Sequence, residues 1–176
     1  MQQRADTFDL SSLHMATGEG RRLNLAVALG EFELAGEHYQ TQPAVVDVRL
    51  DVSRTTANGY ALRLRFEAAL AGACMRCLTH AAPTFAIDAR EVSQPGGGDE
   101  LESPYVSESL PVVLDLGAWA HDALALALPA QVLCRPECLG LCALCGADLN
   151  QAGPDHSHEP APDPRWAKLS ELRFDG

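Results

Sequence analysis

The 176-residue chain has no long hydrophobic run, although 47% of its residues are apolar. A membrane-spanning helix needs about 20 consecutive apolar residues, and no segment approaches that length. Residues 1–22 also lack the compact apolar stretch and the small-residue cleavage site of a signal peptide. We therefore expect a cytoplasmic protein that has no membrane partner and that buries one substantial core.

Basic residues are also scarce. Only 13 Lys and Arg stand against 24 Asp and Glu, which gives a net charge of −11. General nucleic-acid binders neutralise phosphates with basic side chains, so this balance argues against that class. Residues 45–90 are an exception, with six arginines against four acids. This segment is either a solvated sheet face or a local RNA-binding surface.

The motifs of common catalytic sites are missing as well. The chain has no His-Glu-x-x-His motif, and no Lys-Ser or Lys-Thr follows its only run of three glycines, Gly96–Gly98, as a phosphate-binding loop requires. Cys74 and Cys77 lack the βαβ setting of a thioredoxin-like redox pair. We therefore expect a protein that is not an enzyme and has no small-molecule substrate.

The six cysteines are confined to two short segments. One is Cys74-x2-Cys77, and the other is the run Cys134-x3-Cys138-x3-Cys142-x2-Cys145, which two histidines follow. Thiols stay reduced in the cytoplasm, so metal binding is a better interpretation than a disulfide framework. Tetrahedral zinc takes four sulfur or nitrogen ligands, and the eight candidates suffice for two Zn²⁺ ions. They are Cys74, Cys77, Cys134, Cys138, Cys142, Cys145, His156 and His158.

These ligands can be shared in two ways. In the first, Cys74 and Cys77 join Cys134 and Cys138 in an all-thiolate site, and the remaining four ligands form a local site. In the second, the four cysteines of residues 134–145 hold one ion and leave the upstream pair spare. Sequence alone does not pair ligands, and the two histidines can equally be solvent-exposed. A catalytic zinc ion usually has three protein ligands and an open position for water. The eight ligands here suffice to fill all four positions of two ions, so a structural role is favoured over catalysis.

Alternating apolar residues predict strands at 23–29, 46–52, 60–66 and 83–92. Asn58-Gly59 is a turn pair that joins the second and third strands as a hairpin. A loop is expected at 94–105 and a short strand at 110–116. Asp115 can then cap a helix at 117–128. The pattern predicts an α+β fold: an antiparallel sheet, made of the hairpin and flanking strands, with one or two helices and a cysteine-rich zinc-knuckle segment.

The chain divides into four predicted parts. Residues 1–22 form a loosely ordered lead-in, and residues 23–133 form the α+β core. Residues 134–160 are the metal-binding segment with its arm. Residues 161–176 are a C-terminal helix that starts at Asp163 and Pro164 and carries an apolar stripe of Trp166, Leu169 and Leu172.

Three motifs in this order resemble the YceD family, bacterial and plastid proteins named for large ribosomal RNA subunit accumulation. They are Cys74-x-Arg-Cys77-Leu, the run Cys134–Asn150, and Asp163-Pro164-Arg165-Trp166. Many members carry Cys-x-Cys where this chain has His156-Ser-His158. Replacement of cysteine by another zinc-binding residue is what a ligand role predicts.

The resemblance implies a non-enzymatic factor that maintains normal levels of large-subunit (23S) rRNA through its processing, stability or assembly. The implied partners are that rRNA, a ribosomal protein or a processing factor. Direct RNA contact would be local, through the arginines Arg49, Arg63, Arg65, Arg76 and Arg135. The last two also lie between paired cysteines, where they can offset the charge of a thiolate site.

Two other hypotheses remain open at this point. One is an acidic adaptor that binds a basic protein and no RNA. The other is a regulator whose thiolates respond to metal or to oxidation by releasing zinc.

Overall fold

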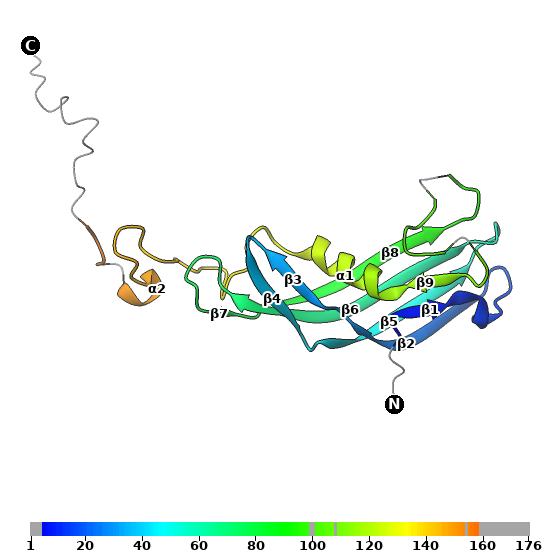
Figure 1. The fold of residues 1–176 in the computed structure, drawn as a ribbon, viewed down its shortest axis with the longest axis horizontal. Helices are drawn as coiled ribbons and strands as arrows, with labels where there is room; N and C mark the ends of the chain where they lie inside the picture. The colour runs from blue at the N-terminus through cyan, green and yellow to red at the C-terminus, as the bar shows by residue number, and fades with distance from the viewer. Residues whose placement is uncertain (1–4, 99–100, 108, 154, 159–176) are drawn as a thin grey trace, which may run out of the picture.

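The computed structural model describes residues 5–98, 101–107, 109–153 and 155–158 (Figure 1). It confirms the α+β class, with a mostly antiparallel sheet, one longer helix and a cysteine-rich segment at one end. The strands are β1 Thr7–Asp9, β2 Gly20–Ala28, β3 Glu31–Leu34, β4 Glu37–Gln42, β5 Val45–Arg54, β6 Tyr60–Ala73, β7 His80–Ala81, β8 Thr84–Ser93 and β9 Val113–Asp115. The helices are the 3-10 turn η1 Leu10–Leu13, α1 Leu116–Ala127 and α2 Leu149–Ala152.

The predicted hairpin is β5–β6. The two strands pair antiparallel from Arg49 opposite Arg65 to Arg54 opposite Tyr60. Their turn contains Asn58 at a φ of +58°, followed by Gly59. A Cβ atom on Gly59 would lie 2.3 Å from the Ser93 carbonyl oxygen, so this position has no room for a side chain.

Strand β6 organises the main sheet because most of the other strands pair with it. The order is β2-β5-β6-β4-β3, with β7 and β8 also paired to β6. β5 covers the first half of β6, β4 takes over at Ala69–Ala71, and β8 runs along the other edge. β7 then pairs with Gly72 and Ala73 at the far end. The strand therefore ends directly at Cys74, and the sheet fixes the position of the first cysteine pair.

One face of the sheet is apolar and packs under helix α1. Alternate residues of β5 and β6, such as Val48, Leu50, Leu62 and Leu64, are at most 3% exposed. α1 buries a stripe at helical spacing, namely Leu116, Trp119, Ala120, Ala123 and Leu124. As predicted, Asp115 caps this helix by accepting a hydrogen bond from the Ala118 amide at 2.9 Å. The helix and the sheet together make the core.

Some elements were not predicted. The expectation of a loosely ordered lead-in is wrong for the described part of residues 1–22, because β1 pairs with β9, η1 buries Leu10, and β2 begins at Gly20. The β3–β4 hairpin was also missed, as was the extension of β6 from residue 66 to Ala73. The predicted helix at 161–176 lies outside the described residues.

Within the described ranges, no helix combines the length and the hydropathy needed to cross a bilayer.

We predict that Gly72→Ala destabilises the sheet beside the cysteine turn. The Tyr39 ring is fully buried against Gly72, and a Cβ there would lie 2.2 Å from Tyr39 Cδ1. Overpacking of this kind costs about 1–3 kcal/mol of unfolding free energy, which urea denaturation measures. Gly20→Ala is the matched control, because the nearest atoms to its Cβ are 3.8 Å away. Equal stability of the two variants would contradict the close packing of Tyr39 on Gly72.

Candidate metal centres

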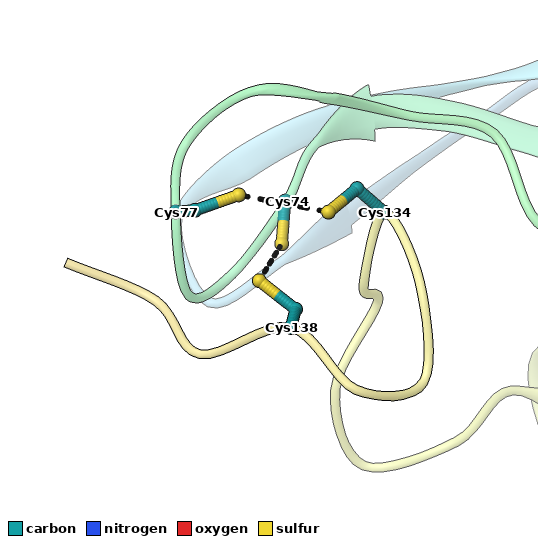
Figure 2. A group of neighbouring side chains, drawn as sticks. All are labelled: Cys74, Cys77, Cys134 and Cys138. Carbon is teal, nitrogen blue, oxygen red and sulfur yellow. Dashed lines mark hydrogen bonds between the residues drawn. The ribbon is translucent and has the colours of Figure 1, made fainter. Parts of the chain in front are cut away.

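The first candidate centre joins the end of the sheet to the chain that follows α1. Cys74 and Cys77 lie in the turn between β6 and β7, whereas Cys134 and Cys138 lie beyond the helix. The returning chain is held by a hydrogen bond from the Met75 amide to the Val132 carbonyl at 2.9 Å. Figure 2 shows the four sulfur atoms pointing toward one another from these two segments.

The sulfur atoms of this centre have the spacing of a tetrahedral thiolate site. Cys74 Sγ lies 3.7 Å from Cys138 Sγ, and Cys77 Sγ lies 3.6 Å from Cys134 Sγ. All four lie within 4.8 Å of one another. Around zinc, with Zn–S bonds of about 2.3 Å, tetrahedral geometry separates sulfurs by about 3.8 Å. Three of the cysteines are at most 5% exposed, and Cys134 is the most exposed of the four. This group can hold a metal ion in a closed site.

The second candidate centre is local and more exposed. Its ligand atoms come from Cys142, Cys145, His156 and His158, and they too lie within 4.8 Å of one another. Cys142 Sγ is 3.2 Å from His158 Nε2, Cys145 Sγ is 3.6 Å from His156 Nε2, and the two Nε2 atoms are 3.1 Å apart. For a tetrahedral zinc ion the expected separations are about 3.5 Å between S and N and about 3.3 Å between the nitrogens. The spacing matches two thiolates and two imidazoles around one ion.

The side chains therefore adopt the first of the two groupings considered from the sequence. Cys134 and Cys138 lie with Cys74 and Cys77, and not with the downstream pair. That these eight residues bind metal stays a prediction.

The two Cys-x-x-Cys turns have the same backbone hydrogen bonds. The Cys74 amide donates to the Thr79 carbonyl and its own carbonyl accepts from Leu78, and the Cys142 amide and carbonyl pair in the same way with Ala147 and Gly146. The residue after the second cysteine has a positive φ in both turns, +60° at Leu78 and +71° at Gly146. We call these two segments, 74–79 and 142–147, the knuckle turns.

Backbone amides in the knuckle turns point at the first sulfur. Burial raises the pKa of Cys74, but hydrogen bonds from the backbone of Cys77, Arg76 and Cys134 outweigh it and lower the pKa to about 6. In the second knuckle turn the Cys145 amide, then the His156 side chain and the Leu144 amide, lower the pKa of Cys142 to about 6. The backbone of each turn therefore favours the thiolate form of its first cysteine, and the thiolate is the form that binds metal.

The other two affected thiols of the first centre shift in opposite directions. A hydrogen bond with the Thr79 hydroxyl, at 3.0 Å, lowers the pKa of Cys77. Burial, followed by hydrogen bonds with Cys77 and Cys138, raises the pKa of Cys134 to about 11.

A compact junction links the two centres. Arg76 donates to the Gln131 side chain at 3.0 Å and to the Cys138 carbonyl at 3.1 Å, and its own carbonyl accepts from the Leu141 amide. Gly140 is buried against Arg76 at a φ of +81°. The Gly140 carbonyl then accepts from the Leu149 amide at 2.9 Å.

Asn150 completes this junction. Its role was not predicted, although it is the last residue of the motif Cys134–Asn150. Its Oδ1 accepts from the Leu139 amide at 2.9 Å and from Arg135 Nη2 at 2.7 Å. Its Nδ2 lies 3.6 Å from Cys138 Sγ, to which it donates. Asn150 therefore orients a candidate ligand from the outside, as second-layer partners of metal ligands do. The available signal was its position five residues after Cys145 at the start of a short helix.

The five arginines considered for RNA contact lie in two places. Arg49, Arg63 and Arg65 are on the outer face of the sheet, whereas Arg76 and Arg135 are in the junction. Arg63 donates twice to Asp88, and Arg65 pairs with Asp51, which also binds Arg22. The pKa of Asp51 is lowered, first by the Arg22 hydrogen bond, and the pKa of Asp88 is lowered by Arg63. In the part of the chain that the structure describes, Arg49 forms no ion pair.

The sequence of this chain matches one family model. A model described as "Large ribosomal RNA subunit accumulation protein YceD" matches residues 62–173. The uncharacterized protein Rv2926c of Mycobacterium tuberculosis is 34% identical over 134 residues, which are 74% of this chain and 63% of that protein. The uncharacterized protein ML1660 of Mycobacterium leprae is 32% identical over 102 residues, 56% of this chain and 46% of that protein. The chain thus spans less than two thirds of the length of these relatives. No solved structure gives a significant match.

We predict that Gly140→Ala weakens the junction more than Gly146→Ala weakens its own turn. Both glycines have a positive φ, so alanine costs roughly 1–2 kcal/mol of backbone strain at either position. Only at Gly140 would the new Cβ also press on Arg76, at 3.2 Å from its carbonyl oxygen. The difference in unfolding free energy between the two variants, measured by denaturant titration, isolates that contact. Equal losses would show that the junction is not tightly packed.

Proposed function

Because the chain belongs to the YceD family of large ribosomal RNA subunit accumulation proteins, we propose that it is a non-enzymatic factor supporting 23S rRNA accumulation in ribosome biogenesis. The observation that carries this proposal is the family match over residues 62–173, which includes both knuckle turns and the junction. A cytoplasmic location is part of the proposal, because ribosomes are assembled there and thiols stay reduced.

The proposal assigns one Zn²⁺ ion to each candidate centre. Thiolate and imidazole ligands at tetrahedral spacing suit zinc better than calcium or magnesium, which take oxygen ligands. Each centre offers four protein ligands, so a bound ion would have no open position for water. The ions would stabilise the fold at the end of the sheet and would take no part in catalysis.

The first centre would carry a charge of about −2 with zinc bound, because four thiolates exceed the charge of one Zn²⁺. Arg76 and Arg135 lie beside it, and they donate hydrogen bonds to neutral amide and carbonyl oxygens. Their charges are therefore available to offset the thiolates. This supports a structural use of these two arginines over an RNA-binding one.

Of the three candidate arginines on the sheet, Arg49 is the one whose charge is not already paired with a carboxylate among the described residues. Arg63 and Arg65 already pair with Asp88 and Asp51, so phosphate would have to compete with carboxylates for them. These ion pairs favour a second candidate function, in which the protein acts on the ribosome through a protein partner and touches no RNA. The net charge of −11 favours a basic partner.

We predict that Cys74→Ser and Cys142→Ser each remove one zinc ion but differ in stability. Loss of the first ion would detach residues 134–138 from the sheet and destabilise the whole domain, whereas loss of the second would leave the sheet intact. Elemental analysis of protein purified without chelator gives the metal content, and thermal unfolding gives the stability. Ser12→Ala is a control far from both centres in the fold. Equal losses of stability, or loss of both zinc ions from either variant, would contradict two independent sites. Wild-type protein without zinc would refute the metal assignment.

We predict that cells lacking the gene have a lowered ratio of large- to small-subunit rRNA, which the wild-type chain restores and the Cys74→Ser chain does not. The ratio is measured on total RNA at matched growth rates. An unchanged ratio in the deletion strain would contradict the proposed function.

Binding experiments with the purified chain distinguish direct contact with rRNA from action through a protein partner. Salt-dependent binding of purified chain to 23S rRNA fragments, weakened by Arg49→Gln but not by Arg21→Gln, would show direct contact. A lowered rRNA ratio in the deletion strain that the wild-type chain restores, together with no binding of the purified chain to these fragments, would favour the protein-partner candidate.

A further inference from the structure

Three leucines beside the candidate metal ligands are exposed to solvent. Leu78 is 66% exposed, Leu139 is 65% exposed and Leu144 is 73% exposed. Each is next to a candidate ligand: Leu78 follows Cys77, Leu139 follows Cys138, and Leu144 precedes Cys145. We call them the knuckle leucines.

Leu78 occupies a backbone conformation that disfavours a leucine. Its φ of +60° is in the left-handed region, where a side chain costs roughly 1–2 kcal/mol. The equivalent position of the other knuckle turn, with the same hydrogen bonds, is Gly146, which carries no such cost. Because the Leu78 side chain is two-thirds exposed, packing within the protein does not offset the strain. Strain without an internal benefit points to use in binding.

The backbone on both sides of the knuckle leucines is held in place, and Leu144 lies in the second knuckle turn, which two backbone hydrogen bonds close. Cys77 and Cys138, whose sulfurs lie within 4.8 Å of each other, anchor Leu78 and Leu139 to one centre. The Leu139 amide is also fixed by Asn150, and the neighbouring Leu141 amide by the Arg76 carbonyl. A pre-organised apolar surface binds at a lower entropic cost than a mobile one.

The surroundings of these leucines are acidic. Residues 74–79 and 134–158 together contain three acids, Glu137, Asp148 and Asp155, against two basic residues, Arg76 and Arg135. Both arginines are hydrogen-bonded to neutral groups of the junction. A zinc-loaded first centre adds a charge of about −2. None of residues 74–79 or 134–150 is aromatic, so these turns have no platform on which RNA bases could stack. Apolar side chains among negative charges suit a partner that is both apolar and basic.

We propose that the knuckle leucines are the docking surface for a basic protein segment that presents apolar side chains. This names the kind of partner through which the protein acts, and it rests on the metal centres of the proposed function because they hold the leucines in place. A protein segment with leucine or isoleucine side chains among lysines and arginines would bury the three leucines and pair with the acids around them.

The test uses the whole 176-residue chain loaded with zinc and a fluorescein-labelled peptide of leucine and lysine with the leucines at helical spacing. Fluorescence anisotropy measures the Kd. Triple replacement by Leu78→Gly, Leu139→Ser and Leu144→Ser should weaken binding at least tenfold. Leu126→Ser is the matched control, because Leu126 is 87% exposed but lies on α1. A peptide of the same composition with the leucines dispersed should bind the wild-type chain no better than it binds the triple variant.

Several outcomes would overturn the proposal. Unchanged affinity of the fully zinc-loaded triple variant would show that the leucines do not dock the peptide. Leucine-dependent binding of an RNA oligonucleotide in place of the peptide would assign the surface to RNA. Tighter peptide binding by Trp166→Ser would assign it to this chain's own C-terminal segment, and concentration-dependent dimers lost in the triple variant would assign it to a second copy. Failure of the metal assignment is distinct, because it appears as missing zinc in the wild-type chain.

A second measurement tests the strain at Leu78 separately. Leu78→Gly alone should keep full zinc content and unfold at the same temperature as wild type or higher, while binding the peptide more weakly. A large loss of stability in this variant would show that Leu78 serves the fold, which contradicts the docking role.

Discussion

The meeting of two chain segments at four sulfur atoms is the constraint on which the rest of the structure depends. The long strand β6 delivers Cys74 and Cys77 to the end of the sheet, and the chain leaving α1 returns there with Cys134 and Cys138 (Figures 1 and 2). Beyond this point the chain forms no further strand pairing with the sheet among the described residues. The junction and the second centre are therefore positioned by the first centre and by the hydrogen bonds of Arg76 and Asn150.

The two knuckle turns share their backbone but differ in one residue. Both have amides directed at the first sulfur and a residue at positive φ after the second cysteine. This shared backbone presents two sulfurs on the same side of the turn, as a metal site of this type would need. The residue at positive φ is glycine in one turn and leucine in the other. The turn itself therefore does not require leucine at this position.

Much of the fold could be predicted because its signals are local. The β5–β6 hairpin has strict alternation and an Asn-Gly turn, and the start of α1 has Asp115 as its cap. The β3–β4 hairpin was missed because it buries few apolar side chains, chiefly Phe32 and Tyr39, among glutamates and glutamines. The spacing of the cysteines left two possible groupings of the ligands. It could not choose between them, because the return of the chain to the sheet after α1 is a tertiary feature. The ion-pair partners of Arg63 and Arg65 depend on the register between neighbouring strands, and the sequence does not reveal that register.

The two centres also differ in how far apart along the chain their ligands lie. Cys74 and Cys138 are 64 residues apart, whereas Cys142 and His158 are 16 apart. Two doublings of loop length add about 1.2 kcal/mol of closure entropy, so the local centre is the cheaper of the two to close. The longer loop contains β8, β9 and α1. Closing the long-range centre therefore ties the two ends of that whole stretch together, whereas closing the local centre orders only its own turn and arm.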